Sequence, residues 1–107
     1  MEIQINTSNN VDGREGLTQQ LEETVRTRMA RFSERLTRIE VHINDENGDR
    51  NAVQDKRCVI EARPAGLEPI SVTDQAGSID QATTGALAKM ATALDRTFGK
   101  MTDRKGH

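Results

Sequence analysis

At 107 residues the chain has the size of a single domain, and its net charge of -2 makes it slightly acidic. It has no tryptophan or tyrosine, and Phe32 and Phe98 are its only aromatic residues, which argues against RNA binding by base stacking on an aromatic platform. Cys58 is the single cysteine, so no intramolecular disulfide is expected and a reducing compartment is favoured. No segment resembles a signal peptide or a membrane span, and we therefore expect a cytoplasmic protein without membrane contact.

The first third of the chain predicts a strand followed by a long helix. Ile3 and Ile5 alternate with polar residues, which is the period of a half-buried strand. Asp12 and Glu15 have the spacing of a capping box that opens a helix. Apolar residues then recur at spacings of four and three, which predicts a helix with one buried face that continues to residue 36. These residues are Leu17, Leu21, Val25, Met29, Phe32 and Leu36.

The middle of the chain predicts three more strands. Apolar residues alternate with polar ones over residues 39–43 and again over residues 58–62, where Val59 is an exception on the outer face. The polar, acidic segment 45–55 between them predicts a long hairpin loop. Pro64-Ala65-Gly66 predicts a turn, and Pro69 lies at the start of a fourth strand, where its missing N–H does little harm.

A second helix is predicted for the last third. Ser78 and Gln81 form a second capping box, and the helix is expected to end near residue 101, with residues 102–107 as a frayed tail. One apolar face runs along this helix. Its residues are Ile79, Ala82, Ala86, Leu87, Met90, Leu94, Phe98 and Met101.

The resulting element order is β-α-β-β-β-α, which predicts an α+β fold. Each helix has one apolar face, and apolar and polar residues alternate along the strands. These patterns imply a four-stranded mixed sheet with two parallel helices packed on one face. The first strand-helix-strand unit is expected to be a right-handed crossover, and the next two connections are hairpins. We expect a single domain over residues 1–107.

Positive charge is concentrated in two segments of this acidic chain. Residues 26–38 contain five arginines and one acid, and residues 89–105 contain five basic residues and two acids. Helical spacing predicts two basic ridges, one on each helix, which could follow a nucleic-acid backbone because guanidinium groups bind phosphate oxygens in pairs. The ridges are Arg28, Arg31 and Arg35 on the first helix and Lys89, Arg96 and Lys100 on the second. A purely structural interpretation is favoured on charge alone, since basic residues near helix C-termini interact favourably with the helix dipole.

Catalysis is not indicated by any group of residues. Cys58 is better interpreted as a small core residue than as a nucleophile. With one cysteine and no histidine pair at helical spacing, a metal site is not expected, and the acids of segment 45–55 lack the spacing of a calcium loop. We expect no enzyme activity, no cofactor, no metal and no small-molecule substrate.

Several short segments together are similar to one known family. They are Ile3-x-Ile5 followed by Asn9-Asn10-Val11, Arg28-Met29-Ala30-Arg31-Phe32, Arg38-Ile39-Glu40-Val41, Ser78-Ile79-Asp80-Gln81-Ala82 and Ala88-Lys89-Met90. With the element order, they resemble the short ribosome hibernation-promoting factors, the ribosome-associated translation inhibitors also called sigma 54 modulation proteins. The first helix is predicted to be about one turn longer than the common family pattern.

The resemblance implies a fold similar to a double-stranded RNA-binding domain with an added strand. It implies binding to the small ribosomal subunit where messenger and transfer RNA would sit, which blocks translation under stress. Arg28, Arg31 and Lys89 match basic positions of the family, which implies contact with ribosomal RNA phosphates. Arg35, Arg96 and Lys100 are added as RNA-binding candidates from helix geometry.

The expected partners are therefore the small ribosomal subunit and its RNA, without DNA. We expect a monomer that lacks the C-terminal dimerisation domain of longer family members. An alternative of another class is a diverged family member that regulates a protein partner, through its acidic sheet and segment 45–55, without binding ribosomes.

Overall fold

The computed structural model describes the backbone of residues 1–8, 14–45 and 56–105, and the side chains of residues 1–8, 16–45 and 56–99. The elements in chain order are β1 (Glu2–Thr7), α1 (Arg14–Arg28), the short 3-10 helix η1 (Ala30–Phe32), β2 (Leu36–Asp45), β3 (Lys56–Pro64), β4 (Ile70–Ala76) and α2 (Ile79–Lys105). Apart from η1, this order is the one predicted.

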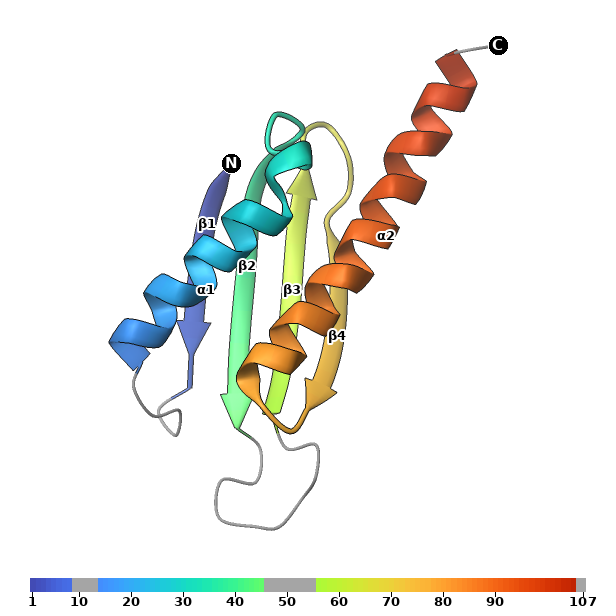
Figure 1. Ribbon diagram of the computed structural model, residues 1–107. Helices are drawn as coiled ribbons and strands as arrows, with labels where there is room; N and C mark the ends of the chain where they lie inside the picture. Colours follow the sequence, from blue (N-terminus) through green and yellow to red (C-terminus); the bar gives the residue numbers. More distant parts are fainter. Residues whose placement is uncertain (9–13, 46–55, 106–107) are drawn as a thin grey trace.

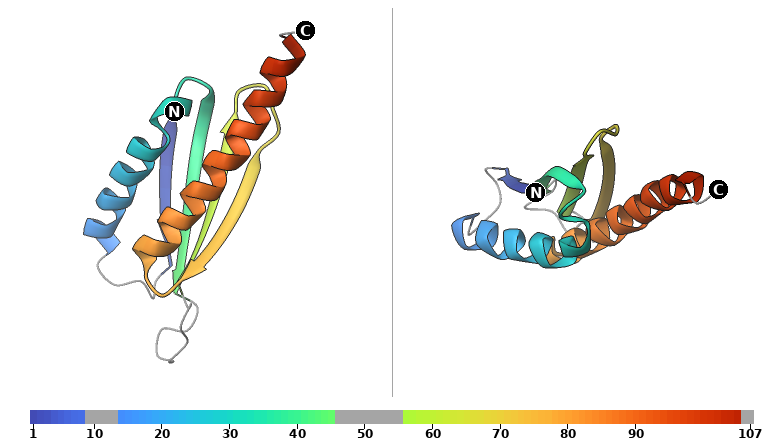
Figure 2. Two further views of the ribbon diagram at one scale, coloured as in Figure 1. Left: turned by 45° about the vertical axis from the view of Figure 1, so that its right-hand side comes forward. Right: turned by 90° about the horizontal axis from the view of Figure 1, so that it is seen from above.

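The four strands form one mixed sheet in the order β1-β2-β3-β4. β1 pairs with β2 in parallel, and the pairs β2–β3 and β3–β4 are antiparallel. Both helices lie on one face of this sheet and run in the same direction, with α1 over β1 and α2 over β3 and β4 (Figures 1 and 2). The predicted α+β fold is confirmed.

The hydrophobic core fills the space between the sheet and the helices. Strand alternation directs Val41 of β2 and Ile60 of β3 into this layer, where both are fully buried and lie opposite each other in the sheet register. Val25 of α1 is also fully buried. Phe32 of η1 packs against Phe98 of α2 with ring centroids 6.0 Å apart, which joins the end of the first helical segment to the second helix.

The first helix is shorter than predicted. It ends at Arg28, so the prediction of a helix reaching residue 36 is wrong. Phe32 and Leu36 are still buried, because η1 and the first residue of β2 direct them inward. The pairing of β2 with β3 shifts register between Leu36 and Arg38, so Leu36 and Ile39 both face the core at a spacing that resembles a helix.

The predicted turn between the third and fourth strands is confirmed. The N–H of Leu67 donates to the carbonyl oxygen of Pro64 at 3.2 Å, which closes a β-turn. Gly66 occupies its third position with φ at 75°, in the left-handed region that glycine adopts without strain. Pro69 immediately precedes β4.

The start of the second helix is also confirmed, and its end differs. The N–H of Gln81 donates to Ser78 Oγ at 3.1 Å, as expected for an N-cap serine. α2 continues to Lys105, beyond the predicted end near residue 101, and extends past the sheet (Figure 1). The predicted cap at Asp12 and nearly all of the predicted loop 45–55 lie outside the described residues.

Candidate nucleic-acid interface

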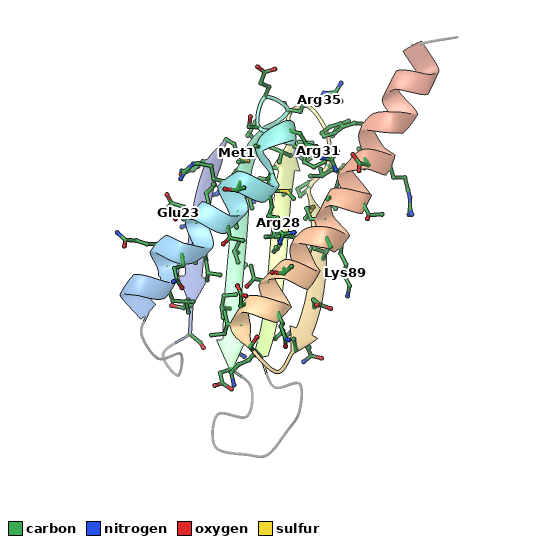
Figure 3. The ribbon with its side chains drawn as sticks, in the orientation of Figure 1. Met1, Glu23, Arg28, Arg31, Arg35 and Lys89 are labelled. Carbon is green, nitrogen blue, oxygen red and sulfur yellow. The ribbon has the colours of Figure 1, made fainter. Side chains whose placement is uncertain are left out.

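A groove with a cavity volume of about 650 Å³ lies between α1 and the first turns of α2. Arg28, the last residue of α1, is exposed and lines this groove (Figure 3). Glu23 of α1 and Asp80 of α2 also line it, so its walls carry both signs of charge. Arg26 is not among the lining residues and instead pairs with Glu22 at 3.2 Å.

A smaller cleft of about 320 Å³ lies where η1 meets α2, and Arg31, Phe32, Arg35 and Phe98 contribute to its walls. The guanidinium carbon of Arg31 lies 4.1 Å from the centroid of the Phe32 ring. That of Arg35 lies 4.5 Å from the centroid of the Phe98 ring. Cation–π contacts therefore hold both guanidinium groups against the two aromatic rings of the chain.

Arg31 also forms a two-pronged ion pair with Asp95 of α2. Nη1 donates to Oδ1 at 2.5 Å and Nη2 donates to Oδ2 at 2.9 Å. Hydrogen bonding to Asp95 raises the pKa of Arg31, and hydrogen bonding to Arg31 lowers the pKa of Asp95. Both side chains are more than half exposed, so water and other solutes have access to the pair.

Lys89 lies on the flank of α2 that faces β4, and Figure 3 shows it on the other side of α2 from Arg28. Its Nζ lies 3.0 Å from Asp74 Oδ1 and donates to the carbonyl oxygen of Thr73 at 2.8 Å. Asp74 packs closely on Gly85, because a Cβ at that glycine would lie 1.9 Å from Asp74 Oδ2. Lys89 thus links α2 to the edge strand of the sheet.

The remaining candidates lie on α2. Arg96 is exposed, and Lys100 belongs to the helix although its side chain lies outside the described residues. Arg31 and Arg35 do not belong to the first helix, so the predicted ridge through them along that helix is wrong. The structure instead brings Arg28, Arg31 and Arg35 to the space between the first helical segment and α2, and it separates them from Lys89 (Figure 3).

Asp95 was missed as a site residue by reasoning from sequence. It is 64 positions away from Arg31 along the chain. Its only signal was that it is one of two acids inside a mostly basic segment. That pattern does not identify a partner, since the pairing depends on how η1 is placed against α2.

The open face of the sheet carries paired charges of both signs. Glu40 of β2 lies at its centre, with Oε2 3.2 Å from Arg38 Nε and 4.0 Å from Arg63 Nη2. His42 Nε2 lies 3.6 Å from the other oxygen of Glu40. Arg63 lies also 3.5 Å from Glu61. The described part of this face is therefore mixed in charge, whereas the alternative function assumed an acidic sheet.

Cys58 is fully buried, and burial raises the pKa of its thiol to about 11, so it is protonated at neutral pH and unsuited to be a nucleophile. Within the described residues, no group of three or more histidine, cysteine, aspartate or glutamate side chains is arranged to hold a metal ion. No helix in the part of the chain that the structure describes is long and apolar enough to cross a membrane.

The family model described as sigma 54 modulation protein / S30EA ribosomal protein matches residues 5–102. The chain belongs to this family. The resemblance found from short motifs is thereby confirmed, and the family description indicates a ribosome partner. It is not a known family of enzymes. No curated protein matches the sequence at a significant level.

Two solved structures share the fold of this family member. A ribosomal subunit interface protein from Coxiella burnetii is 16% identical, with a TM-score of 0.69 over 92% of this chain and 99% of that chain. The N-terminal domain of Thermus thermophilus Protein Y is also 16% identical, with a TM-score of 0.66 over 91% of this chain and 99% of that domain. At this level of identity the likeness establishes the fold.

Proposed function

We propose that the protein binds the small ribosomal subunit through its RNA and blocks translation by occupying the path of messenger and transfer RNA. The observation that carries this proposal is family membership over residues 5–102. Inhibition would follow from occlusion alone, because no catalytic group is needed to exclude another RNA from the same site. A ribosome partner also implies that the protein acts in the cytoplasm.

Exposed arginines on the helix-covered side support phosphate binding. Arg28, Arg35 and Arg96 are exposed and have no carboxylate partner among the described side chains. Their guanidinium groups can therefore donate to phosphate oxygens without first breaking an ion pair. Contact by Lys89 would require its pair with Asp74 to open, and contact by Lys100 remains a prediction from sequence.

Binding would depend on the RNA backbone and its shape. Phe32 and Phe98 are buried, and the guanidinium groups of Arg31 and Arg35 lie over them. Neither ring is available as a platform for an RNA base. The proposed interface therefore resembles recognition of folded RNA by phosphate contacts, whose affinity falls as salt rises.

A double charge reversal, compared with a single reversal outside the groove, tests this interface. Arg28→Glu combined with Arg35→Glu is expected to weaken binding to purified small subunits by about tenfold or more, because hydrogen bonds to charged groups contribute about 1.5–3 kcal/mol each. Arg26→Glu is the control, since Arg26 belongs to the same helix as Arg28 but does not line the groove. Equal affinities for the double variant, the control and the wild type would contradict the interface.

Translation assays with the same three proteins test the consequence. In a cell-free system the wild type and Arg26→Glu are expected to inhibit protein synthesis, and the double variant is expected to need a higher concentration. A wild-type protein that binds neither small subunits nor inhibits synthesis, but captures one protein partner, would instead support the protein-interaction regulator.

A further inference from the structure

We propose that Asp95 is an internal competitor for the phosphate that Arg31 would bind, so that the cleft between η1 and α2 is a phosphate site occupied by the protein's own carboxylate. This inference rests on the proposed RNA-binding function. It adds an acidic residue, Asp95, to the proposed interface, and the role of this residue is to weaken RNA binding. RNA would bind here by displacing Asp95 from Arg31.

The geometry of the pair is the first argument. Nη1 and Nη2 of Arg31 each donate to a different oxygen of Asp95, at 2.5 and 2.9 Å. An arginine presents the same pair of donors to two oxygens of a phosphate. The carboxylate therefore occupies the donors that an RNA phosphate would use, and the two ligands exclude each other.

The second argument is that the cleft is already organised for an anion. Arg31 and Arg35 both line it, and each guanidinium group is held against a buried phenylalanine ring. Stacking lowers the conformational freedom that each side chain would lose on binding a ligand. Asp95 offsets the charge of one arginine only, which leaves the described part of the cleft with net positive charge.

The third argument is that the pair can be broken without opening the fold. Arg31 and Asp95 are 57% and 53% exposed, and ion pairs of this kind contribute little to stability. The contact between the Phe32 and Phe98 rings joins η1 to α2 independently of the ion pair. Displacement of Asp95 therefore requires a side-chain rotation and leaves the packing of the aromatic rings in place.

The test is the affinity of Asp95→Asn for purified small subunits, measured beside the wild type. The asparagine keeps the shape of the side chain and removes its charge, so binding is expected to become about two- to fivefold tighter, the range of a weak exposed ion pair. Glu34→Gln is the matched control, because it removes one exposed negative charge three residues from Arg31, and Glu34 forms no ion pair with another described residue.

The dependence on Arg31 separates competition from a general effect of charge. In an Arg31→Ala background, Asp95→Asn is expected to change affinity no more than Glu34→Gln does. If Asp95→Asn binds with the same affinity as Glu34→Gln, or more weakly than the wild type, the proposal is overturned. Binding by the wild type would in that case still support the proposed function. Absence of binding by the wild type and by Asp95→Asn overturns the function as well.

Discussion

Asp95 owes its low pKa to Arg31, which donates hydrogen bonds to both of its oxygens. A carboxyl group whose pKa is lowered by folding stabilises the folded state when the pH is above its ordinary pKa. This contribution to stability is lost as the pH falls through the lowered pKa. The link between η1 and α2 is therefore expected to weaken in acid. Arg31→Ala is expected to raise the pKa of Asp95 toward its ordinary value, as measured by an NMR titration of the side-chain carboxyl. An unchanged pKa would show that the pair does not form in solution.

Cys58 makes a prediction at the opposite end of the pH scale. Burial raises the pKa of its thiol from 9.0 to about 11, so the folded state favours the protonated form. That contribution is complete below pH 9 and is lost as the pH rises toward 11. Urea unfolding of the wild type is expected to show a steeper loss of stability over this interval than unfolding of Cys58→Ala. Parallel curves for the two proteins would contradict the assignment.

Gly85 makes a third prediction at the scale of single residues. A methyl group there would lie 1.9 Å from Asp74 Oδ2, so Gly85→Ala must displace Asp74 and with it the partner of Lys89. Because the nearest atoms belong to the Asp74 carboxylate, which can rotate away at the cost of its partly exposed ion pair with Lys89, we expect a loss of about 1 kcal/mol or less. Gly99→Ala in the same helix meets no atom within 4 Å and is expected to stabilise the protein by up to about 1 kcal/mol.

The relief of this contact can be tested directly. Asp74→Ala removes the atoms nearest to the new methyl group and leaves its own Cβ at 3.6 Å, an ordinary contact distance. Gly85→Ala is therefore expected to destabilise the Asp74→Ala protein less than the wild type in chemical denaturation. An equal loss of stability in both backgrounds would show that contact with Asp74 is not the cause.

At the scale of elements, the helices depend on what they bury against the sheet. Leu94 of α2 is fully buried in the core, and Leu94→Ala is expected to reduce the free energy of unfolding by about 2–5 kcal/mol. Leu67, in the turn before β4, is 37% exposed. Leu67→Ala is expected to change stability by about 0.5 kcal/mol or less. Similar losses for the two variants would contradict the observed placement of α2 on the sheet.

The sheet was predictable from the sequence because apolar and polar residues alternate along most of its strands. Val41 faces the core between two polar neighbours, and Ile60 faces it between Val59 and Glu61, so a period of two indicates both strands and their inner face. The end of α1 was not predictable. Phe32 lies in the 3-10 helix η1 and Leu36 lies at the irregular start of β2, yet both continue the apolar spacing of α1. Buried residues at spacings of three and four therefore span three different elements.

The candidate site was predictable only in part, for a related reason. The sequence shows which residues are basic, and Arg28, Arg35 and Arg96 are exposed as expected. The pairing of Arg31 with Asp95 and of Lys89 with Asp74 depends on the packing of α2 against η1 and β4. Local spacing carries no information about either contact.

At the scale of the whole molecule, an acidic chain presents several arginines on the helix-covered side of an α+β fold. Its family membership indicates a ribosome partner, and the proposed mode of contact is electrostatic. The central claim is therefore that the protein binds small ribosomal subunits through phosphate contacts. Net charge alone does not decide it, because local arginines determine the field at a contact surface.

The most direct measurement is co-sedimentation of the wild-type protein with purified small subunits through sucrose gradients over a series of salt concentrations. If Arg28, Arg31, Arg35 and Arg96 each neutralise one phosphate, the logarithm of the affinity should fall with the logarithm of salt with a slope of about -3. Co-migration with this salt dependence is the predicted result. No co-migration at low salt, or binding that is unaffected by salt, would contradict the proposed RNA-binding function.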